Sequence, residues 1–97
     1  MPQLFVEDVD DAYLVDLRSD ESLVLGRSPD ADLRVASPRA SRRHVEIRAA
    51  TQGHVAVDLG STNGTSVNGA RLEAERRLED GDVIDVAGCF VVYRRGA

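Results

Sequence analysis

The stretch "SPRASRRHVEI" combines residue types that could perform chemistry, because Ser41 and His44 lie three residues apart with two arginines between them. A Ser–His nucleophile needs its base within hydrogen-bond reach and a third group that orients the base, and side chains at the extended entry to a strand diverge. We therefore expect His44 to bond loop backbone through its ring nitrogens. Ser41 then offers a hydroxyl, and Arg42 a charge, at one loop tip.

A second such stretch is "DLGSTNGTSVNG", Asp58 to Gly69, which contains two Asn-Gly pairs. Each pair predicts a type I′ hairpin turn, in which both central residues have positive φ. The small hydroxyl residues before the first pair are not needed for a hairpin, and on a tight turn they can present several hydrogen-bond partners to a ligand. The string is not a phosphate loop of the nucleotide-binding type, since it lacks the Lys after the second Gly and the helix that would follow.

In "LGRSPDADLRV" the pair Gly26-Arg27 closes a strand, and the following Ser, Pro and Asp residues favour a turn. Arg27 has two interpretations at this point. In the first, Arg27 is a solvated charge at the end of a strand. In the second, Gly26 leaves room beside the Arg27 guanidinium, which is directed at the loop end of the fold.

Charge is unevenly distributed along the chain. The formal net charge is −5, which argues against general nucleic-acid binding, because such domains need a surplus of cations to displace counterions from phosphates. Residues 1–25 contain seven acids against Arg18, whereas residues 26–48 contain six arginines against three acids. One basic segment therefore lies in an acidic protein.

The elements that must position these residues are short apolar runs, rich in β-branched residues and separated by turn signals. In "HVEIR" Val45 and Ile47 alternate with polar residues, in "HVAVDL" Val55, Val57 and Leu59 do so, and Val83, Ile84 and Val86 are expected in the core. No window of eleven residues keeps a helical period. We predict an all-β, two-sheet sandwich of about eleven short strands with binding loops at one end. The expected strands are Leu4–Glu7, Ala12–Leu17, Ser22–Gly26, Leu33–Val35, His44–Ala49, His54–Asp58, Ser66–Val67, Arg71–Leu72, Arg76–Leu78, Asp82–Val86 and Phe90–Arg94.

Length and cysteine content bound the remaining possibilities. The 97 residues suit a single domain, 1–97. Cys89 is the single cysteine, so no intrachain disulfide forms, and with only His44 and His54 beside it we expect no metal site and no cofactor. We expect a soluble protein of a reducing cytoplasm, without a leader, a membrane segment or a membrane partner.

The order of these motifs resembles the forkhead-associated, or FHA, domain family. The matching residues are Gly26-Arg27, then Ser41-x-x-His44, then Asn63-Gly64, then Leu78-x-x-Gly81-Asp82, and they cover essentially the whole chain. The resemblance implies an eleven-stranded β-sandwich that binds phosphothreonine in partner proteins of Ser/Thr-kinase signalling and has no enzymatic activity of its own. In the family, threonine is preferred over serine because its methyl group enters a small pocket.

The resemblance also implies roles for individual residues. Arg27 would pair with the phosphate, Ser41 would donate its hydroxyl to it, and Arg42 would add charge or a backbone donor. Thr62 would help to hold the phosphothreonine, and Asn63 would bond the peptide main chain beside it. The structural positions of the family correspond to Gly26, His44 and Gly64.

Two other functions stay open at this point. The sandwich could be an assembly domain that docks a partner independently of phosphorylation, with the loop arginines incidental. It could also be a small hydrolase that uses Ser41 and His44, although no acid is placed to orient the histidine and no Gly-x-Ser-x-Gly elbow exists. The sequence makes no prediction of the oligomeric state.

Overall fold

The computed structural model describes residues 1–96, which form eleven β-strands connected by turns and loops. Each expected segment overlaps one of these strands, so the predicted all-β fold class is confirmed. None of the described residues belongs to a helix that is long and apolar enough to cross a membrane. The strands are β1 (Gln3–Glu7), β2 (Ala12–Asp16), β3 (Leu23–Gly26), β4 (Leu33–Arg34), β5 (Val45–Ala50), β6 (Gly53–Asp58), β7 (Ser66–Val67), β8 (Ala70–Arg71), β9 (Arg76–Arg77), β10 (Val83–Val86) and β11 (Cys89–Arg94).

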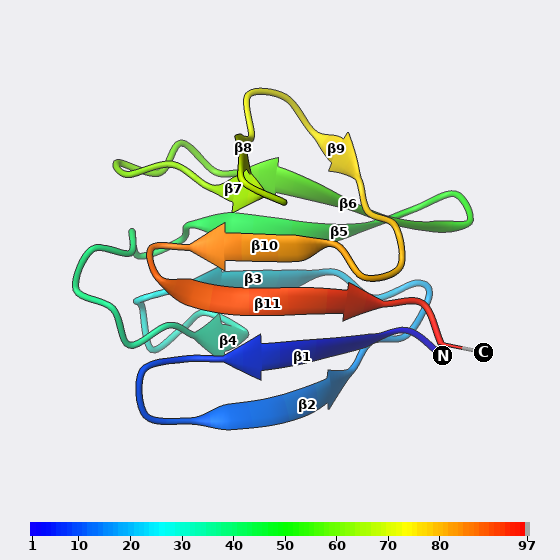
Figure 1. The fold of residues 1–97 in the computed structure, drawn as a ribbon, viewed down its shortest axis with the longest axis horizontal. Coiled ribbons are helices and arrows are strands. Elements are labelled where there is room, and N and C mark those ends of the chain that lie inside the picture. The colour runs from blue at the N-terminus through cyan, green and yellow to red at the C-terminus, as the bar shows by residue number, and fades with distance from the viewer. Residues whose placement is uncertain (97) are drawn as a thin grey trace.

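The strands are arranged in two sheets that pack as layers (Figure 1). The six-stranded sheet has the order β2-β1-β11-β10-β7-β8, and the five-stranded sheet has the order β4-β3-β5-β6-β9. Antiparallel pairing dominates both sheets, and β3 and β4 form a parallel pair. The sandwich is 34 Å along its longest axis.

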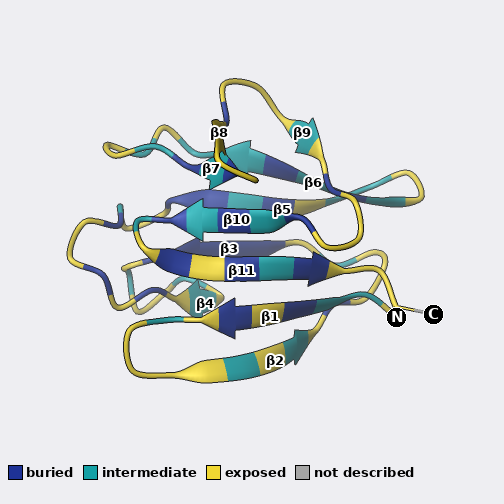
Figure 2. Cartoon of the chain, viewed as in Figure 1, coloured by how far each residue is buried: buried dark blue, intermediate teal, exposed yellow. Residues whose placement is uncertain are grey.

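The core lies between the sheets and follows the alternation of the strands. Leu4 and Val6 in β1 are buried, and Val91 and Tyr93 are buried on β11 beside them. Figure 2 shows this alternation as buried and exposed bands along the same strands. Each fully buried Leu, Ile or Val side chain contributes about 1.5–3 kcal/mol relative to its exposed state, so these inward faces fix which side of each strand points to solvent.

Strand β6 buries the opposite face from the one its sequence suggests. The expected inward residues Val55 and Val57 are only half-buried, whereas His54 and Ala56 are fully buried. Register explains the correction: Ala56 is the cross-strand partner of the buried Ile47, and cross-strand partners share a face. On β10, Val83 likewise faces outward, while its neighbours Ile84 and Val86 enter the core.

Burial of His54 is possible because both ring nitrogens are paired. Its Nδ1 lies 3.0 Å from the Tyr93 hydroxyl, and its Nε2 lies 3.1 Å from the carbonyl oxygen of Glu21. The two rings also meet edge to face, with centroids 5.7 Å apart. A buried polar group costs little when it is hydrogen-bonded, so the apolar valines could be left on the outer face.

Five connections meet at one end of the sandwich, on the left of Figure 1. They join β1 to β2, β3 to β4, β4 to β5, β6 to β7 and β10 to β11. Because most successive strands run in opposite directions, segments far apart in the sequence arrive at this end together. We refer to it as the loop end.

Candidate functional site

Gly26 allows the β4–β5 loop to lie against the end of β3. A Cβ atom at this buried position would fall far inside the van der Waals radius of the Arg42 carbonyl oxygen. Two backbone hydrogen bonds fix the close approach: Arg27 N–H donates to Ser41 O at 2.9 Å, and Ser28 N–H donates to Arg42 O at 3.1 Å. The glycine is therefore required by main-chain packing.

Arg27 lies against the loop that Gly26 admits. Its Nε donates to the carbonyl oxygen of Ala40 at 3.1 Å, and the side chain is otherwise exposed. A guanidinium has five N–H donors in a planar fork. With Nε held by the backbone, the two terminal nitrogens of Arg27 are positioned and available to an anion.

Ser41 joins the β4–β5 loop to the β6–β7 loop. Its hydroxyl oxygen accepts a hydrogen bond from Thr62 N–H at 3.0 Å, which leaves the hydroxyl proton available for donation. One residue on, Asn63 Nδ2 donates to the carbonyl oxygen of Arg39 at 2.7 Å. These two bonds bring Ser41, Thr62 and Asn63 together on one surface with Arg27.

His44 connects the β4–β5 and β6–β7 loops from the core side. The ring is fully buried; its Nδ1 accepts a hydrogen bond from Ser41 N–H at 3.0 Å, and its Nε2 lies 2.7 Å from Gly64 O. Because a carbonyl only accepts, this pattern assigns the proton to Nε2. Both ring nitrogens are thus used on backbone groups, as the sequence predicted, and neither bonds the Ser41 hydroxyl.

Asp58 organises the β6–β7 loop, and sequence reasoning missed it. Its carboxylate accepts hydrogen bonds from the Ser61 hydroxyl at 2.5 Å, the Thr65 hydroxyl at 2.8 Å, and the backbone N–H groups of Gly60 and Ser61. Partial burial by itself would raise the pKa of Asp58, but these hydrogen bonds to the charged form outweigh it, and the pKa is lowered. The hydroxyls of Ser61 and Thr65 therefore bond the protein rather than a ligand.

The two Asn-Gly pairs adopt different conformations, which corrects one expectation. Asn68 (φ 51°) and Gly69 (φ 83°) form the predicted type I′ turn between β7 and β8. At the first pair only Gly64 has positive φ (80°), and no hairpin forms there. Asn63 is instead held by the hydrogen bond from its side chain to the Arg39 carbonyl oxygen in the neighbouring loop.

Arg71 is a second feature that the sequence did not indicate. It lies on β8, and a Cβ atom on Gly64 would come within 2.9 Å of its guanidinium carbon. The guanidinium therefore lies against the Gly64 main chain, whereas the positive φ of Gly64 (80°) is what makes a side chain at residue 64 strained. A long-range contact of this kind leaves no local sequence signal.

Within the described part of the chain, the arginines of the loop end form no ion pairs with acidic residues. Residues 1–96 contain two ion pairs, Arg18–Asp20 and Arg48–Glu46, and neither lies in this group. The exposed, unpaired arginines of the segment 26–43 are Arg27, Arg34, Arg39, Arg42 and Arg43.

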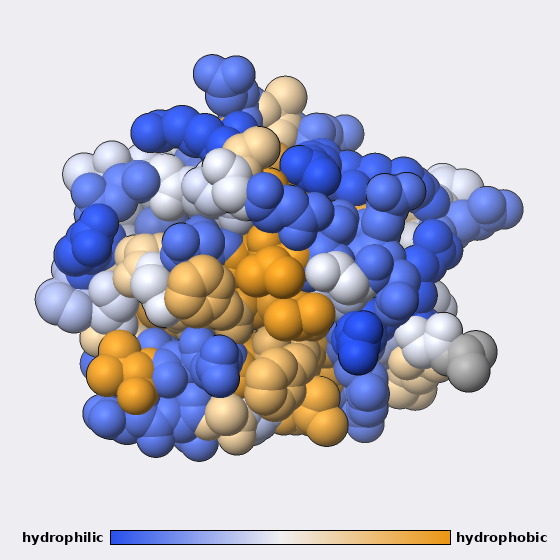
Figure 3. All heavy atoms as spheres, in the orientation of Figure 1, coloured by the Kyte–Doolittle hydropathy of each residue, from blue (hydrophilic) through white to orange (hydrophobic). Residues whose placement is uncertain are grey.

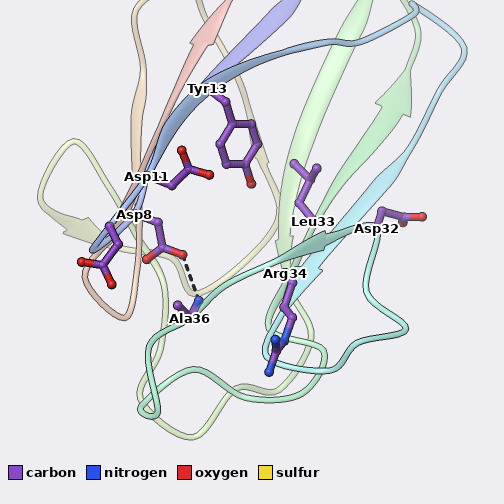
Figure 4. Close-up of a pocket in the computed structure, with 8 residues that line it drawn as sticks. Asp8, Asp11, Tyr13, Asp32, Leu33, Arg34 and Ala36 are labelled. Atoms are coloured by element: carbon purple, nitrogen blue, oxygen red, sulfur yellow. Dashed lines mark hydrogen bonds between the residues drawn. The ribbon is translucent and has the colours of Figure 1, made fainter.

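An acidic pocket lies at the same end, between the β1–β2 turn and β4 (Figure 4). Asp8 lines it and accepts a hydrogen bond from Ala36 N–H at 2.9 Å. Burial raises the pKa of Tyr13 in this pocket, and the charges of Cys89, Asp8 and Asp11 raise it further. Arg34 also lines the pocket but faces four acidic residues there, so the remaining arginines of the loop end form the side that favours an anion. The acidic residues of the lining are Asp8, Asp10, Asp11 and Asp32.

Comparison with known proteins decides the family. The FHA domain model matches residues 23–87, which include the β3–β4, β4–β5 and β6–β7 loops. The chain belongs to the FHA domain family. The FHA domain-containing protein FhaA of Mycobacterium tuberculosis is 44% identical over 73 residues, which are 75% of this chain and 14% of FhaA. The chain spans only a small part of the first curated relatives it matches.

Two solved structures are similar over nearly the full chain. The FhaA FHA domain, complexed with the intracellular domain of Rv3910, has 38% identity and a TM-score of 0.85, and the match covers 97% of this chain and 100% of that one. A structure from an analysis of phosphothreonine-dependent FHA domain interactions has 36% identity and a TM-score of 0.82, with 99% and 97% covered.

Proposed function

We propose that this FHA domain binds phosphothreonine-containing segments of partner proteins in Ser/Thr-kinase signalling. The observation that carries the proposal is the pairing of Arg27 and Ser41: both are fixed by bonds to neighbouring loops, and both keep donors available at the same surface. A phosphothreonine brings about −1.5 to −2 charges and three acceptor oxygens. Charge-assisted bonds from a guanidinium fork and a hydroxyl suit that group.

The remaining site residues take secondary roles in this proposal. Arg42 adds positive charge at the loop tip, Thr62 holds the phosphothreonine, and Asn63 bonds the peptide main chain. Because Asn63 spends only one amide hydrogen on Arg39, its second hydrogen and its oxygen are available to the peptide. Gly26, His44 and Gly64 act by holding the loops.

The relatives support this choice of ligand. One similar structure comes from work on phosphothreonine-dependent FHA domain interactions, and another shows an FHA domain bound to a partner's intracellular domain. The proposal includes a single module over residues 1–97, without catalysis, cofactor or bound metal, in the cytoplasm. His44 supports the absence of hydrolase chemistry, since its Nδ1 is used on the Ser41 backbone.

Fluorescence anisotropy with degenerate peptide mixtures centred on phosphothreonine, phosphoserine or threonine tests the proposal. We expect binding of the phosphothreonine mixture only. Arg27→Ala should weaken it at least about tenfold, because a charge-assisted hydrogen bond contributes about 1.5–3 kcal/mol. Arg27→Lys, which keeps the charge but not the fork, should bind at an intermediate level. Arg18→Ala, with the same loss of charge outside the loop end, is the matched control.

The alternative of a phosphorylation-independent assembly domain predicts a different result. In that case the threonine and phosphothreonine mixtures bind equally well, or neither binds, and Arg27→Ala behaves like Arg18→Ala. Undiminished binding by folded Arg27→Ala would reject the phosphate-binding proposal.

A further inference from the structure

The outer face of the six-stranded sheet carries an apolar row that the binding loops do not use. Its members are direct cross-strand neighbours: Leu14 on β2 faces Phe5 on β1, Phe5 faces Val92 on β11, and Val92 faces Val83 on β10. Leu14 is 61% exposed and Phe5 36% exposed. Figure 3 shows apolar side chains gathered on this face.

Charged residues flank the apolar row differently on its two sides. Toward the loop end, the next outward row contains Glu7 on β1, Phe90 on β11 and Asp85 on β10, again as direct neighbours, and we call it the acidic row. Toward the opposite end, the outward row contains Asp16, Gln3 and Arg94, with Gln3 donating to Asp16 at 2.9 Å. Arg94 and Glu7 make no ion pair among residues 1–96.

We propose that this face binds a second copy of the chain, face to face, with the two-fold axis running across the strands through the apolar row. This axis stacks Phe5, Val92 and Leu14 on the same residues of the second copy. It also exchanges the two flanking rows, so that Arg94 lies over Phe90 of the second copy. Glu7 and Asp85 of that copy flank Phe90 on the neighbouring strands, one strand spacing of about 4.8 Å to each side.

Charge complementarity selects this axis over the other in-plane choice. A two-fold axis along the strands would instead place the acidic row of one copy on the acidic row of the other. It would also place Arg94 of one copy beside Arg94 of the other. The axis across the strands gives each Arg94 two acidic neighbours and an aromatic face, which favour a guanidinium through ion pairing and cation–π contact. These two attractive contacts outnumber the one like-charge approach that the axis creates, between Asp16 and Glu7 of the second copy. Isologous contacts of this kind are the commonest route to closed dimers.

The size of the face sets the expected strength. Four strands span about 19 Å, and five residues along a strand span about 17 Å. A standard interface buries about 800 Å² on each partner, and this face is smaller, so the dimer is weak and reversible. Its two loop ends point in opposite directions and stay open, so that one dimer presents two separate binding sites. The proposal does not depend on phosphate binding.

Sedimentation velocity on the full chain, from micromolar to millimolar concentration, tests the proposal. We expect the weight-average mass to rise from the monomer toward the dimer value. Leu14→Asp should keep the monomer mass throughout, because it places two carboxylates face to face within the contact, on the edge strand β2. Val9→Asp, an equal change at an apolar residue 72% exposed in the β1–β2 turn, should associate like the unmodified protein.

A charge exchange tests the orientation. Arg94→Glu should abolish association, and Arg94→Glu combined with Glu7→Arg should restore it. Circular dichroism checks that each variant is folded, and Arg27→Ala should dimerise normally whatever its effect on peptides. A monomer at millimolar concentration, equal association by Leu14→Asp, or failure of the double exchange to restore the dimer would overturn the proposal.

Discussion

Gly26 lies where the main chain of the β4–β5 loop crosses the end of β3. We expect Gly26→Ala to destabilise the fold by about 2 kcal/mol or more, because the new methyl group overlaps a backbone carbonyl that cannot move without breaking two hydrogen bonds. Thermal unfolding gives the change in stability. Peptide binding should fall with it, since the displaced loop carries Ser41.

Gly69→Ala is the matched control for this change. Gly69 has positive φ, but no atom lies within 4 Å of the place its methyl group would take, so only backbone strain of about 1 kcal/mol opposes alanine there. The difference in stability between Gly26→Ala and Gly69→Ala measures the cost of the steric overlap with the Arg42 carbonyl. Equal stabilities of the two variants would contradict the packing role assigned to Gly26.

Asp58 makes the β6–β7 loop sensitive to acid. Its pKa is lower in the folded protein, so its contribution to stability is present above the pKa of the unfolded chain, about 4, and is lost as the pH falls through the folded value. Asp58→Asn should therefore be less stable than the unmodified protein at neutral pH. The gap should narrow below about pH 4.

Urea unfolding at a series of pH values measures this gap. Asp10→Asn, in the exposed β1–β2 turn, is the control and should leave stability nearly unchanged at neutral pH. A gap between Asp58→Asn and the unmodified protein that stays constant from neutral to acid pH would show that the carboxylate charge does not stabilise the loop.

Two hairpins of the six-stranded sheet have two-residue turns with positive φ, but the residues in these turns differ. Asn68-Gly69 joins β7 to β8 with a residue that tolerates positive φ, whereas Ala87-Gly88 joins β10 to β11 with alanine at φ 52°. Ala87→Asn should therefore raise stability by about 0.5–1 kcal/mol, which is roughly 2–8 °C in melting temperature for a domain of this size. Differential scanning calorimetry measures the shift.

The reciprocal change is Asn68→Ala. Here the loss should be larger than strain alone, because the Asn68 amide donates to Asp82 at 2.9 Å and accepts from Val83 N–H at 2.9 Å. We expect a cost of about 1–3 kcal/mol. A neutral effect of Asn68→Ala, or a loss of stability in Ala87→Asn, would show that turn conformation does not limit these hairpins.

At the scale of the whole molecule, the packing of the two sheets controls access to Cys89. The thiol is fully buried in the core, and burial, followed by the charges of Asp8 and Asp85, raises its pKa to about 12. The reactive thiolate is thus scarce and shielded at neutral pH. We expect a disulfide reagent to label Cys89 only as fast as the whole sandwich unfolds.

Labelling in native buffer and in denaturant measures this protection. Ala70→Cys in the exposed β7–β8 hairpin provides a second thiol as the fast reference in the same molecule. Rapid labelling of Cys89 in native buffer would show that the sheets separate locally without global unfolding.

The eleven strands, the β7–β8 turn and the loop-holding role of His44 could all be predicted from the sequence. Local signals specify these features: alternation along Val45 and Ile47 requires one buried face, and Asn68-Gly69 supplies positive φ wherever it occurs. The family motifs also placed Arg27, Ser41 and Asn63 in loops between strands, and these loops meet at one end of the sandwich. Their binding roles are the proposal made above.

Which groups meet at that end depends on the folded chain and could not be predicted. The inward face of β6 depends on its register with β5 and on partners for His54 that lie 33 and 39 residues away. Asp58 accepts the hydroxyl of Ser61, which the sequence pattern offered to a ligand, together with that of Thr65, and the bond from Asn63 to Arg39 replaces a hairpin. These contacts join segments that are distant in the sequence. They form only when the folded chain brings the segments together, so no local pattern of residues predicts them.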